Sequence, residues 1–211
     1  MCRILWVRSE QPIEIADHLK YFANISRDSK EYQGHGWGCA WLEKGLWKIY
    51  RNIKPVWEDD LSHFGTTTLL LAHARSAFRD EGIEVENNMP FFDGKKVFIF
   101  NGELRGVRIR EQGRIGAEKI FNYIKRFDKN DSLFDLKKAI NIINKKTRYI
   151  RAMNFIVASD KNAKLASIYN ENQSYFQIYE TKQKGVHIVC SDPYPGQPNW
   201  SPIDNETIRT L

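Results

Sequence analysis

The sequence predicts a single α+β domain, and three observations support this prediction. Strand-like runs gather toward the two ends of the chain, amphipathic helical segments lie mainly between them, and strands and helices do not alternate one by one. Regular alternation is typical of doubly wound parallel sheets and barrels, whereas clustered strands with separate helices favour layered antiparallel sheets. The length of 211 residues suits one domain, and we find no repeat or linker that divides residues 1–211.

Short apolar runs predict strands in both halves of the chain. The first half contains runs at residues 2–7, 37–42, 46–51, 67–74 and 96–100. The second and third of these are separated by Glu43-Lys44-Gly45, a short glycine-containing connection typical of a β-hairpin. Four later runs, separated by polar turn residues, predict a β-meander at residues 152–159, 163–169, 174–179 and 186–190.

Apolar residues at helical spacing predict three helices. The stripes are Ile15, Leu19 and Phe22 in the first, Ala117, Ile120, Phe121 and Ile124 in the second, and Leu133, Leu136, Ile140 and Ile143 in the third. Pro12 precedes the first stripe and suits a first helical turn. Ser132 and Asp135 have the spacing of a capping box at the start of the third helix.

Composition excludes several classes of protein. The hydrophobic content of 42% is enough for a core, but no stretch approaches 18 consecutive apolar residues, so we expect no membrane span. We also find no charged and apolar leader that would direct secretion. The three cysteines have neither metal-ligand spacing nor the pattern of a disulfide framework. We therefore expect a cytoplasmic protein without a metal or other cofactor.

The net charge of +6 raises nucleic-acid binding as an alternative function. The basic residues are spread over two amphipathic segments and are not gathered into one track, which is typical of a solvated face. We therefore expect neither a nucleic acid nor a membrane as a partner.

The second residue carries the strongest functional signal. Removal of Met1 is favoured by a small neighbour, and it would leave Cys2 with both a thiol and a free α-amine. The α-amine titrates about 2 units below a lysine, so it can accept the thiol proton near neutral pH. One residue would then supply nucleophile and base. The alternative is that Cys2 is an incidental residue of the first strand.

Three further segments have functional and purely structural interpretations. Gly36-Trp37 lies in a glycine-rich entry to a strand, where the backbone can approach a ligand closely or make a tight turn. Arg75, followed by Ser76, ends a very apolar strand and needs the carboxylate of either the protein or a substrate. Asn101-Gly102 ends a buried strand, where it can supply the two donors of an oxyanion hole or form a common turn.

The order of these segments is more specific than any one of them. The chain contains Cys2, Gly36-Trp37-Gly38, His73-Ala74-Arg75, Asn87-Asn88-Met89-Pro90-Phe91, Asn101-Gly102, and Ser191-Asp192-Pro193 with Trp200. This order resembles the class II glutamine amidotransferases, which are N-terminal-nucleophile hydrolases, and in particular their small stand-alone members. The resemblance extends from Cys2 to about Trp200. It implies a four-layer αββα sandwich of antiparallel sheets.

The resemblance also implies roles for individual residues. Cys2 would be the nucleophile, and the Asn101 side chain with the Gly102 N–H would stabilise the oxyanion. Arg75 would bind the carboxylate of glutamine or a γ-glutamyl compound, with Ser76 and Gly36-Trp37 beside it. Attack on the side-chain amide would give a γ-glutamyl thioester and release ammonia or an amine, and water would then complete the cycle.

The chain departs from the family pattern at three positions. Members of the family usually carry an aspartate that binds the substrate's α-amino group, and Gly116 stands in its place here. Met89 and Phe100 replace two usual histidines. These changes predict a more apolar pocket and a substrate other than plain glutamine, such as an N-acylated γ-glutamyl compound.

Two questions stay open at this point. The hydrolase fold accounts for nearly the whole length, so a synthetase that uses released ammonia would have to be a separate chain. The protein would otherwise act alone on γ-glutamyl amides. The loss at Gly116 also favours an alternative, a catalytically silent subunit of the same fold with a binding or regulatory role, although the retained Cys2, Arg75 and Asn101-Gly102 favour an enzyme.

Overall fold

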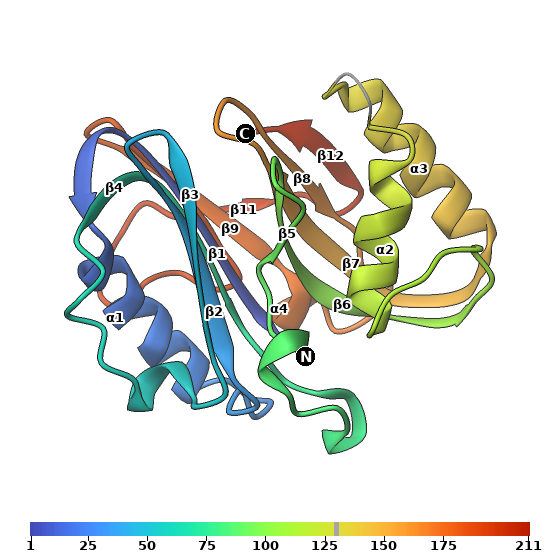
Figure 1. Ribbon diagram of the computed structural model, residues 1–211, viewed down its shortest axis with the longest axis horizontal. Helices are drawn as coiled ribbons and strands as arrows, with labels where there is room; N and C mark the ends of the chain where they lie inside the picture. The colour runs from blue at the N-terminus through green and yellow to red at the C-terminus, as the bar shows by residue number, and fades with distance from the viewer. Residues whose placement is uncertain (129–130) are drawn as a thin grey trace.

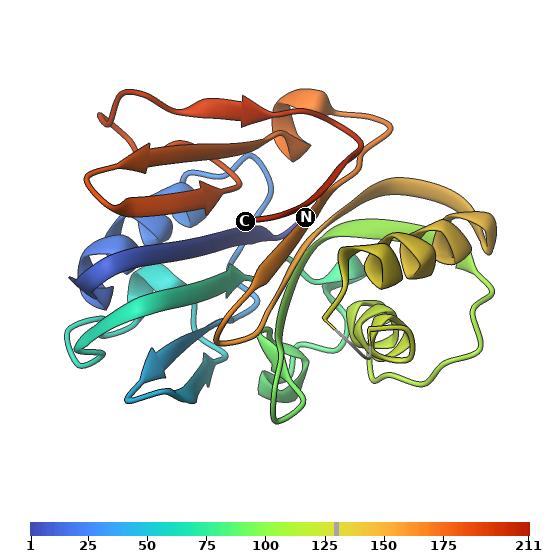
Figure 2. The same cartoon turned by 90° about the horizontal axis from the view of Figure 1, so that it is seen from above.

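A computed structural model describes residues 1–128 and 131–211 and contains two antiparallel sheets packed face to face. Helices cover the outer faces of the sheets, which gives the layer order α, β, β, α (Figure 1). Figure 2 shows the same layers from above, with the N-terminus close to the junction of the two sheets. The predicted α+β sandwich is confirmed.

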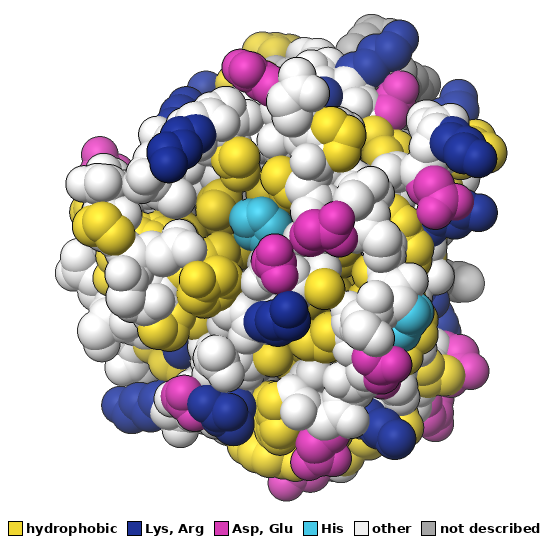
Figure 3. Space-filling view, turned by 90° about the vertical axis from the view of Figure 1, so that its left-hand side faces the viewer, with side chains coloured by type: hydrophobic (Ala, Val, Ile, Leu, Met, Phe, Trp, Pro, Cys, Tyr) yellow, Lys and Arg dark blue, Asp and Glu magenta, His cyan; other side chains and the backbone are white. Residues whose placement is uncertain are grey.

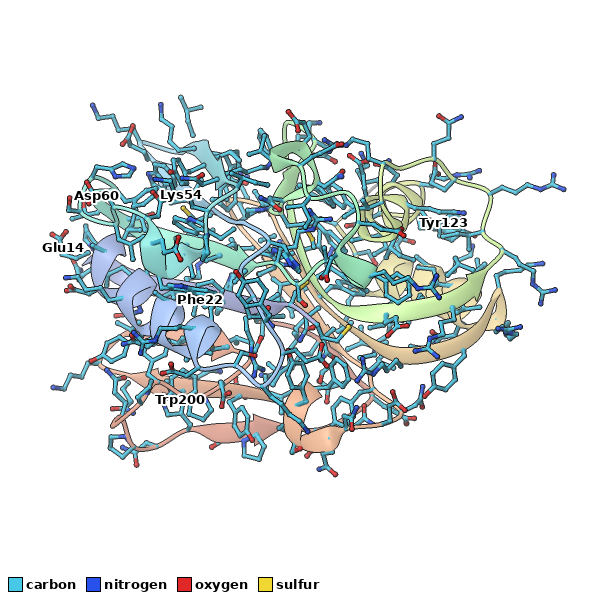
Figure 4. The ribbon with its side chains drawn as sticks, turned by 90° about the horizontal axis from the view of Figure 1, so that it is seen from below. Glu14, Phe22, Lys54, Asp60, Tyr123 and Trp200 are labelled. Atoms are coloured by element: carbon cyan, nitrogen blue, oxygen red, sulfur yellow. The ribbon has the colours of Figure 1, made fainter. Side chains whose placement is uncertain are left out.

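The larger sheet has seven strands and carries helix α1 on its outer face. Its order is β11 (Ser201–Ile203), β9 (Ile178–Gln183), β10 (Val186–Cys190), β1 (Arg3–Glu14), β4 (Thr66–Ala74), β2 (Trp37–Glu43) and β3 (Leu46–Asn52). Helix α1 (Ile15–Arg27) buries the predicted stripe of Ile15, Leu19 and Phe22 against this sheet. Figure 4 labels Phe22 on the side of the helix that lies over the strands.

The smaller sheet has five strands and carries two helices. Its order is β12 (Thr207–Thr210), β8 (Ala163–Ser167), β7 (Thr147–Ala158), β6 (Val97–Val107) and β5 (Phe91–Phe92). Helices α2 (Gly116–Lys125) and α3 (Leu133–Lys145) pack on it, and the Phe98 and Phe121 rings stack with centroids 4.9 Å apart. Ser132 caps α3 as predicted, because its hydroxyl accepts from the N–H groups of Phe134 and Asp135. Figure 4 labels Tyr123 of α2 on the side of the molecule away from α1.

Four short helical turns complete the fold, and one of them replaces part of a predicted strand. They are η1 (Val56–Glu58), η2 (Phe78–Asp80), η3 (Val85–Asn87) and α4 (Gln173–Phe176). The strand predicted at residues 174–179 is wrong over residues 174–176, where one helical turn buries Tyr175 and Phe176; the strand β9 begins at Ile178. Pro12 does not begin α1. It lies in β1 between Arg8 and Ile13, where the register with β4 shifts and a missing N–H is tolerated.

The segment Asn101-Gly102 does not form the turn that an Asn-Gly pair commonly makes. Both residues lie inside β6, which continues to Val107. A Cβ at Gly102 would lie 2.2 Å from the Ala152 carbonyl oxygen of the neighbouring strand. The glycine is therefore required by close approach of β6 to β7, with a register shift directly after it at Glu103.

Two observations concern membrane spanning and the distribution of basic side chains on the surface. None of the helices in residues 1–128 and 131–211 is long and apolar enough to cross a membrane. On the face shown in Figure 3, Lys and Arg side chains are interspersed with acidic and apolar side chains.

Candidate functional site

A cavity of about 920 Å³ opens where β1 begins, β4 ends and β6 passes the first turn of α2. Of the residues singled out in the sequence, its walls include Cys2, Arg75, Ser76, Gly102 and Gly116. The structure therefore brings together segments that lie far apart in the chain, and strand pairing explains how.

The register of β1 and β4 places Cys2 beside Arg75. Arg3 pairs with Ala74 in an antiparallel ladder, so the residue before Arg3 lies next to the residue after Ala74. On the other side of β1, the Ile4 N–H donates to the Ser191 hydroxyl at 2.8 Å, and the Ser191 N–H donates to the Ile4 carbonyl at 3.0 Å. The start of β1 is thus held from both sides.

A histidine connects this point to the second sheet. His73 of β4 is fully buried, and its Nε2 lies 3.2 Å from the Phe100 carbonyl oxygen in β6. A carbonyl only accepts, so Nε2 carries a proton. Burial lowers the pKa of His73 to about 3, and the nearby Arg75 adds to this effect. His73 therefore links the strand that carries Arg75 to the strand that carries Asn101 and Gly102.

The Cys2 thiol lies at the cavity wall. Its Sγ donates to the Ser76 carbonyl at 3.7 Å, so Ser76 meets the cysteine through its backbone. Burial raises the pKa of the Cys2 thiol, while the chain's ammonium group and Arg75 oppose the rise. A thiol in this position needs a base to become nucleophilic near neutral pH.

Met1 precedes Cys2 and is held by side chains that the sequence analysis did not identify. Its ammonium group pairs with Glu31, and its carbonyl accepts from Gln33 Nε2 at 2.6 Å and from the Tyr175 hydroxyl at 2.5 Å. While Met1 is present, the Cys2 nitrogen is an amide and cannot act as a base. No motif marks Glu31, Gln33 or Tyr175, since only tertiary packing brings them to the chain's beginning.

Arg75 is 5% exposed and has no carboxylate partner among the described residues. Its backbone N–H donates to the Gly36 carbonyl at 2.9 Å, and its Nη2 donates weakly to the Glu81 carbonyl at 3.5 Å. Its Nη1 is buried without a hydrogen-bond partner. Burial lowers the pKa of Arg75, and an unsatisfied buried guanidinium is costly. A carboxylate in the cavity would satisfy it.

Asn101 and Gly102 differ in how they meet the cavity. Gly102 lines it, whereas Asn101 is 1% exposed and is not among the lining residues. Asn101 lies opposite Asn154 in the sheet, and its Oδ1 is buried without a partner. Asn154 is used structurally, because its Nδ2 donates to the Phe176 carbonyl at 2.8 Å.

Gly36 and Trp37 do not reach the cavity wall. Trp37 is buried in the core between α1 and the larger sheet, and its Nε1 donates to Asp59 Oδ2 at 2.9 Å. Gly36 contributes indirectly through the hydrogen bond that fixes the Arg75 backbone. Asn88 packs so closely on Gly36 that its amide nitrogen would lie 2.0 Å from a Cβ there, so only glycine fits.

The first turn of α2 forms the opposite wall of the cavity. Apart from Gly116 itself, its two chain neighbours and the backbone of its own helix, no described atom lies within 4 Å of the place that a Cβ on Gly116 would take, so the missing side chain leaves open space. Glu118 is directed to Arg114, with its Oε1 2.5 Å from Nη2. Met89 and Phe100 line the cavity as apolar surface.

The cavity wall carries more positive than negative charge. Its cationic residues are Arg75, Arg79, Arg105, Arg114, Lys119 and Arg151, and its acidic residues are Glu31, Glu81 and Glu103. Within the two described ranges, no group of His, Cys, Asp and Glu side chains is arranged to hold a metal ion.

No protein-family model matches the sequence, and neither does any curated protein. Solved structures do match. A glutamine aminotransferase class-II domain protein from Silicibacter pomeroyi has a TM-score of 0.70 at 16% identity over 99% of this chain and 94% of that chain. The glutamine phosphoribosylpyrophosphate amidotransferase of B. subtilis has a TM-score of 0.69 at 14% identity, covering 100% of this chain and 49% of that chain.

A predicted glutamine amidotransferase from Pseudomonas aeruginosa matches with a TM-score of 0.59 at 14% identity, over 99% of this chain and 96% of that chain. The chain thus has the fold of class II glutamine amidotransferase domains, and the resemblance seen in the sequence motifs is confirmed for the fold. It spans about half the length of the B. subtilis enzyme and nearly the whole length of the other two proteins.

Proposed function

We propose that this protein is an amidohydrolase that cleaves the side-chain amide of a γ-glutamyl compound through a thioester on Cys2. One observation carries the proposal. Cys2, the uncompensated guanidinium of Arg75 and the Gly102 backbone share one cavity in a fold used by glutamine amidotransferases. Nucleophile, carboxylate partner and oxyanion donor are the groups that such a reaction needs.

The reaction requires that Met1 be removed, so that Cys2 gains a free α-amine. The amine accepts the thiol proton as sulfur attacks the amide carbon, and the proton then passes to the leaving nitrogen. Ammonia or an amine departs, and a γ-glutamyl thioester remains. Water adds to the thioester carbon, the sulfur leaves as the thiol, and a free γ-carboxylate is the product.

The oxyanion formed in both steps is assigned to the Gly102 N–H and the Asn101 side-chain amide. Gly102 already lines the cavity. The Asn101 amide, at the adjacent position of β6, is the proposed second donor, because its Oδ1 has no hydrogen bond that holds it in place. Loss of one such donor typically slows a reaction about 100- to 1000-fold.

The substrate is proposed to lack a free α-ammonium group. Arg75 is suited to its α-carboxylate, but Gly116 offers no side chain to an ammonium group. A missing charge-assisted hydrogen bond costs about 1.5–3 kcal/mol of binding. An α-N-acylated γ-glutamyl amide avoids this loss.

We infer that the activity belongs to a reducing cytoplasm, where the Cys2 thiol stays reduced. Glutamine is the nitrogen source that the names of the structural neighbours indicate. If released ammonia is used further, we propose a separate synthetase chain as the user; the match to the B. subtilis amidotransferase covers 49% of that chain.

A silent binding or regulatory subunit is the second candidate. The ion pair of Met1 with Glu31 favours it, because a retained Met1 leaves Cys2 without its base. The two candidates differ in whether Met1 is kept and whether the thiol turns over substrate.

The experiment measures γ-carboxylate and ammonia release from glutamine and from Nα-acetylglutamine by the processed protein. We expect turnover of Nα-acetylglutamine at a higher kcat/KM than glutamine. Cys2→Ala should lower turnover about a thousandfold or more while the melting temperature is retained, since the residue lies at a chain end. Cys39→Ala is the matched control, because that thiol is buried outside the cavity. Undiminished turnover by Cys2→Ala would contradict the proposal.

A further inference from the structure

We propose that the substrate carries a second carboxylate, bound at Lys119 and the first turn of α2, in addition to the carboxylate at Arg75. The inference rests on the proposed γ-glutamyl hydrolase function and names the substrate class more closely. It follows from the distribution of paired and unpaired charges on the cavity wall.

The acidic side chains of the wall are largely occupied by cations other than Arg75 and Lys119. Glu31 pairs with the Met1 ammonium group and lies 3.5 Å from Arg151. Glu103 pairs with Arg105 at 2.6 Å and with Arg151 at 3.5 Å. These five charged groups therefore neutralise one another in the absence of a ligand.

Three cations of the wall, Arg75, Arg79 and Lys119, have no such partner among the described residues, and Arg79 lies on the exposed turn η2 over the Phe78 ring. Arg75 has a buried Nη1 with no hydrogen-bond acceptor, and it makes no ion pair with a described carboxylate. Lys119 lines the cavity from α2 and makes no ion pair. Glu118, its neighbour on the helix, is turned to Arg114 instead. The unpaired acid of the wall is the exposed Glu81, which meets Arg75 only through its backbone carbonyl.

The start of α2 adds positive potential next to Lys119. Gly116 and Ala117 both line the cavity, and the N–H groups of a first helical turn have no partner within the helix. Ile115 at the N-cap provides no side-chain cap. The helix dipole and the open space at Gly116 thus favour an anion where a larger side chain would fill the volume.

The ligand that fits is a γ-glutamyl amide whose α-nitrogen carries an acyl group ending in a carboxylate. The α-carboxylate would satisfy Arg75, the acyl chain would cross the apolar surface of Met89 and Phe100, and the terminal carboxylate would reach Lys119. A cationic group in the same place would face Lys119 and the helix N-terminus and would be repelled.

The test uses Cys2→Ala protein, which binds without turnover, and two probes of matched structure. Nα-Acetylglutamine has one carboxylate, and Nα-succinylglutamine has a second at the end of its acyl chain. Isothermal titration should show about tenfold or greater preference for the succinyl compound. Adding Lys119→Gln should reduce this preference to less than about threefold, with little change for the acetyl compound.

Lys125→Gln is the matched control, since it removes one positive charge from the same helix away from the cavity. It should leave the preference unchanged. The proposal is overturned if the two probes bind equally, if neither binds, if Lys119→Gln keeps the preference, or if Lys125→Gln removes it as fully.

Parallel assays with the protein that retains Cys2 separate this inference from the proposed function. Equal kcat/KM for both probes would leave the hydrolase function intact and refute the second carboxylate site. A succinyl preference in binding, without hydrolysis of either probe, would support the site and refute the hydrolase.

Discussion

The two walls of the cavity are built differently and carry different information. The strand wall contains Cys2, Arg75 and Gly102, whose positions follow from the pairing of β1 with β4 and from the His73 contact to β6. The helix wall contains Gly116 and Lys119 on the first turn of α2. Strand pairing fixes the positions of the residues on the strand wall. On the helix wall, a single substitution on the first turn of α2 changes the charge. Under the proposed function, the strand wall would carry the reaction and bind the α-carboxylate, and the helix wall would select the group on the α-nitrogen.

Among variants that keep Cys2, the largest effect on the strand wall is expected from Asn101→Ala. If its amide stabilises the oxyanion, kcat should fall about 100- to 1000-fold with little change in KM, because the interaction exists mainly in the transition state. Steady-state kinetics with Nα-acetylglutamine checks this, and a thermal melt excludes a folding defect. An unchanged kcat would remove Asn101 from the reaction.

Arg75→Gln tests ground-state recognition at the same wall. Loss of a charge-assisted pair with the substrate carboxylate should raise KM about 10- to 100-fold and lower kcat much less. Arg148→Gln serves as a control, because this arginine is exposed on β7 and does not line the cavity. A fall in kcat at constant KM would instead place Arg75 in the reaction itself.

Gly116→Asp changes only the helix wall, so it tests directly whether this wall distinguishes a free α-ammonium group from an acylated α-nitrogen. A carboxylate in the open space beside α2 should favour a free ammonium group, so KM for glutamine should fall about tenfold. KM for Nα-succinylglutamine should rise, and kcat for both should stay near its original value. Equal effects on both substrates would show that the helix wall does not distinguish them.

The last prediction concerns stability and the link between the sheets. Burial lowers the pKa of His73 from its ordinary value near 6.5 to about 3. Between these two pH values the histidine is protonated in the unfolded chain but not in the folded protein. Stability should therefore fall as the pH is lowered through this range. Between pH 6.5 and 4 the loss from this residue approaches about 3 kcal/mol.

His73→Gln removes the titrating group, so its denaturant-unfolding free energy should depend less on pH than that of the unmodified protein. His63→Gln is the control, because His63 is exposed. Parallel pH curves for His73→Gln and the unmodified protein would contradict the buried neutral imidazole.

Local sequence patterns predicted most of the fold and part of the site. Alternating and continuous apolar runs located the strands around Leu71 and Ile99, and the stripe of Ile15, Leu19 and Phe22 located α1. Pro12 and residues 174–179 were misread, since a register shift in β1 and the burial of Tyr175 depend on tertiary contacts.

The site was predictable where it depends on motif order and unpredictable where it depends on packing. Cys2, Arg75 and Gly102 meet as the order of motifs implied. Gly36 and Trp37 lie behind the wall, because β2 presents the tryptophan to the core under α1. Glu31 and Lys119 carry no local signal, and only the folded chain brings them to the cavity.

The proposed reaction at the strand wall requires removal of Met1, which frees the α-amine of Cys2. Intact-mass analysis tests this removal most directly. The protein purified from a cytoplasmic expression host should lack one methionine. Treatment with a glutamine-like electrophile should then add one label, which peptide mapping places on Cys2 and not on Cys39 or Cys190. A chain that retains Met1, or a label absent from Cys2, would contradict the account.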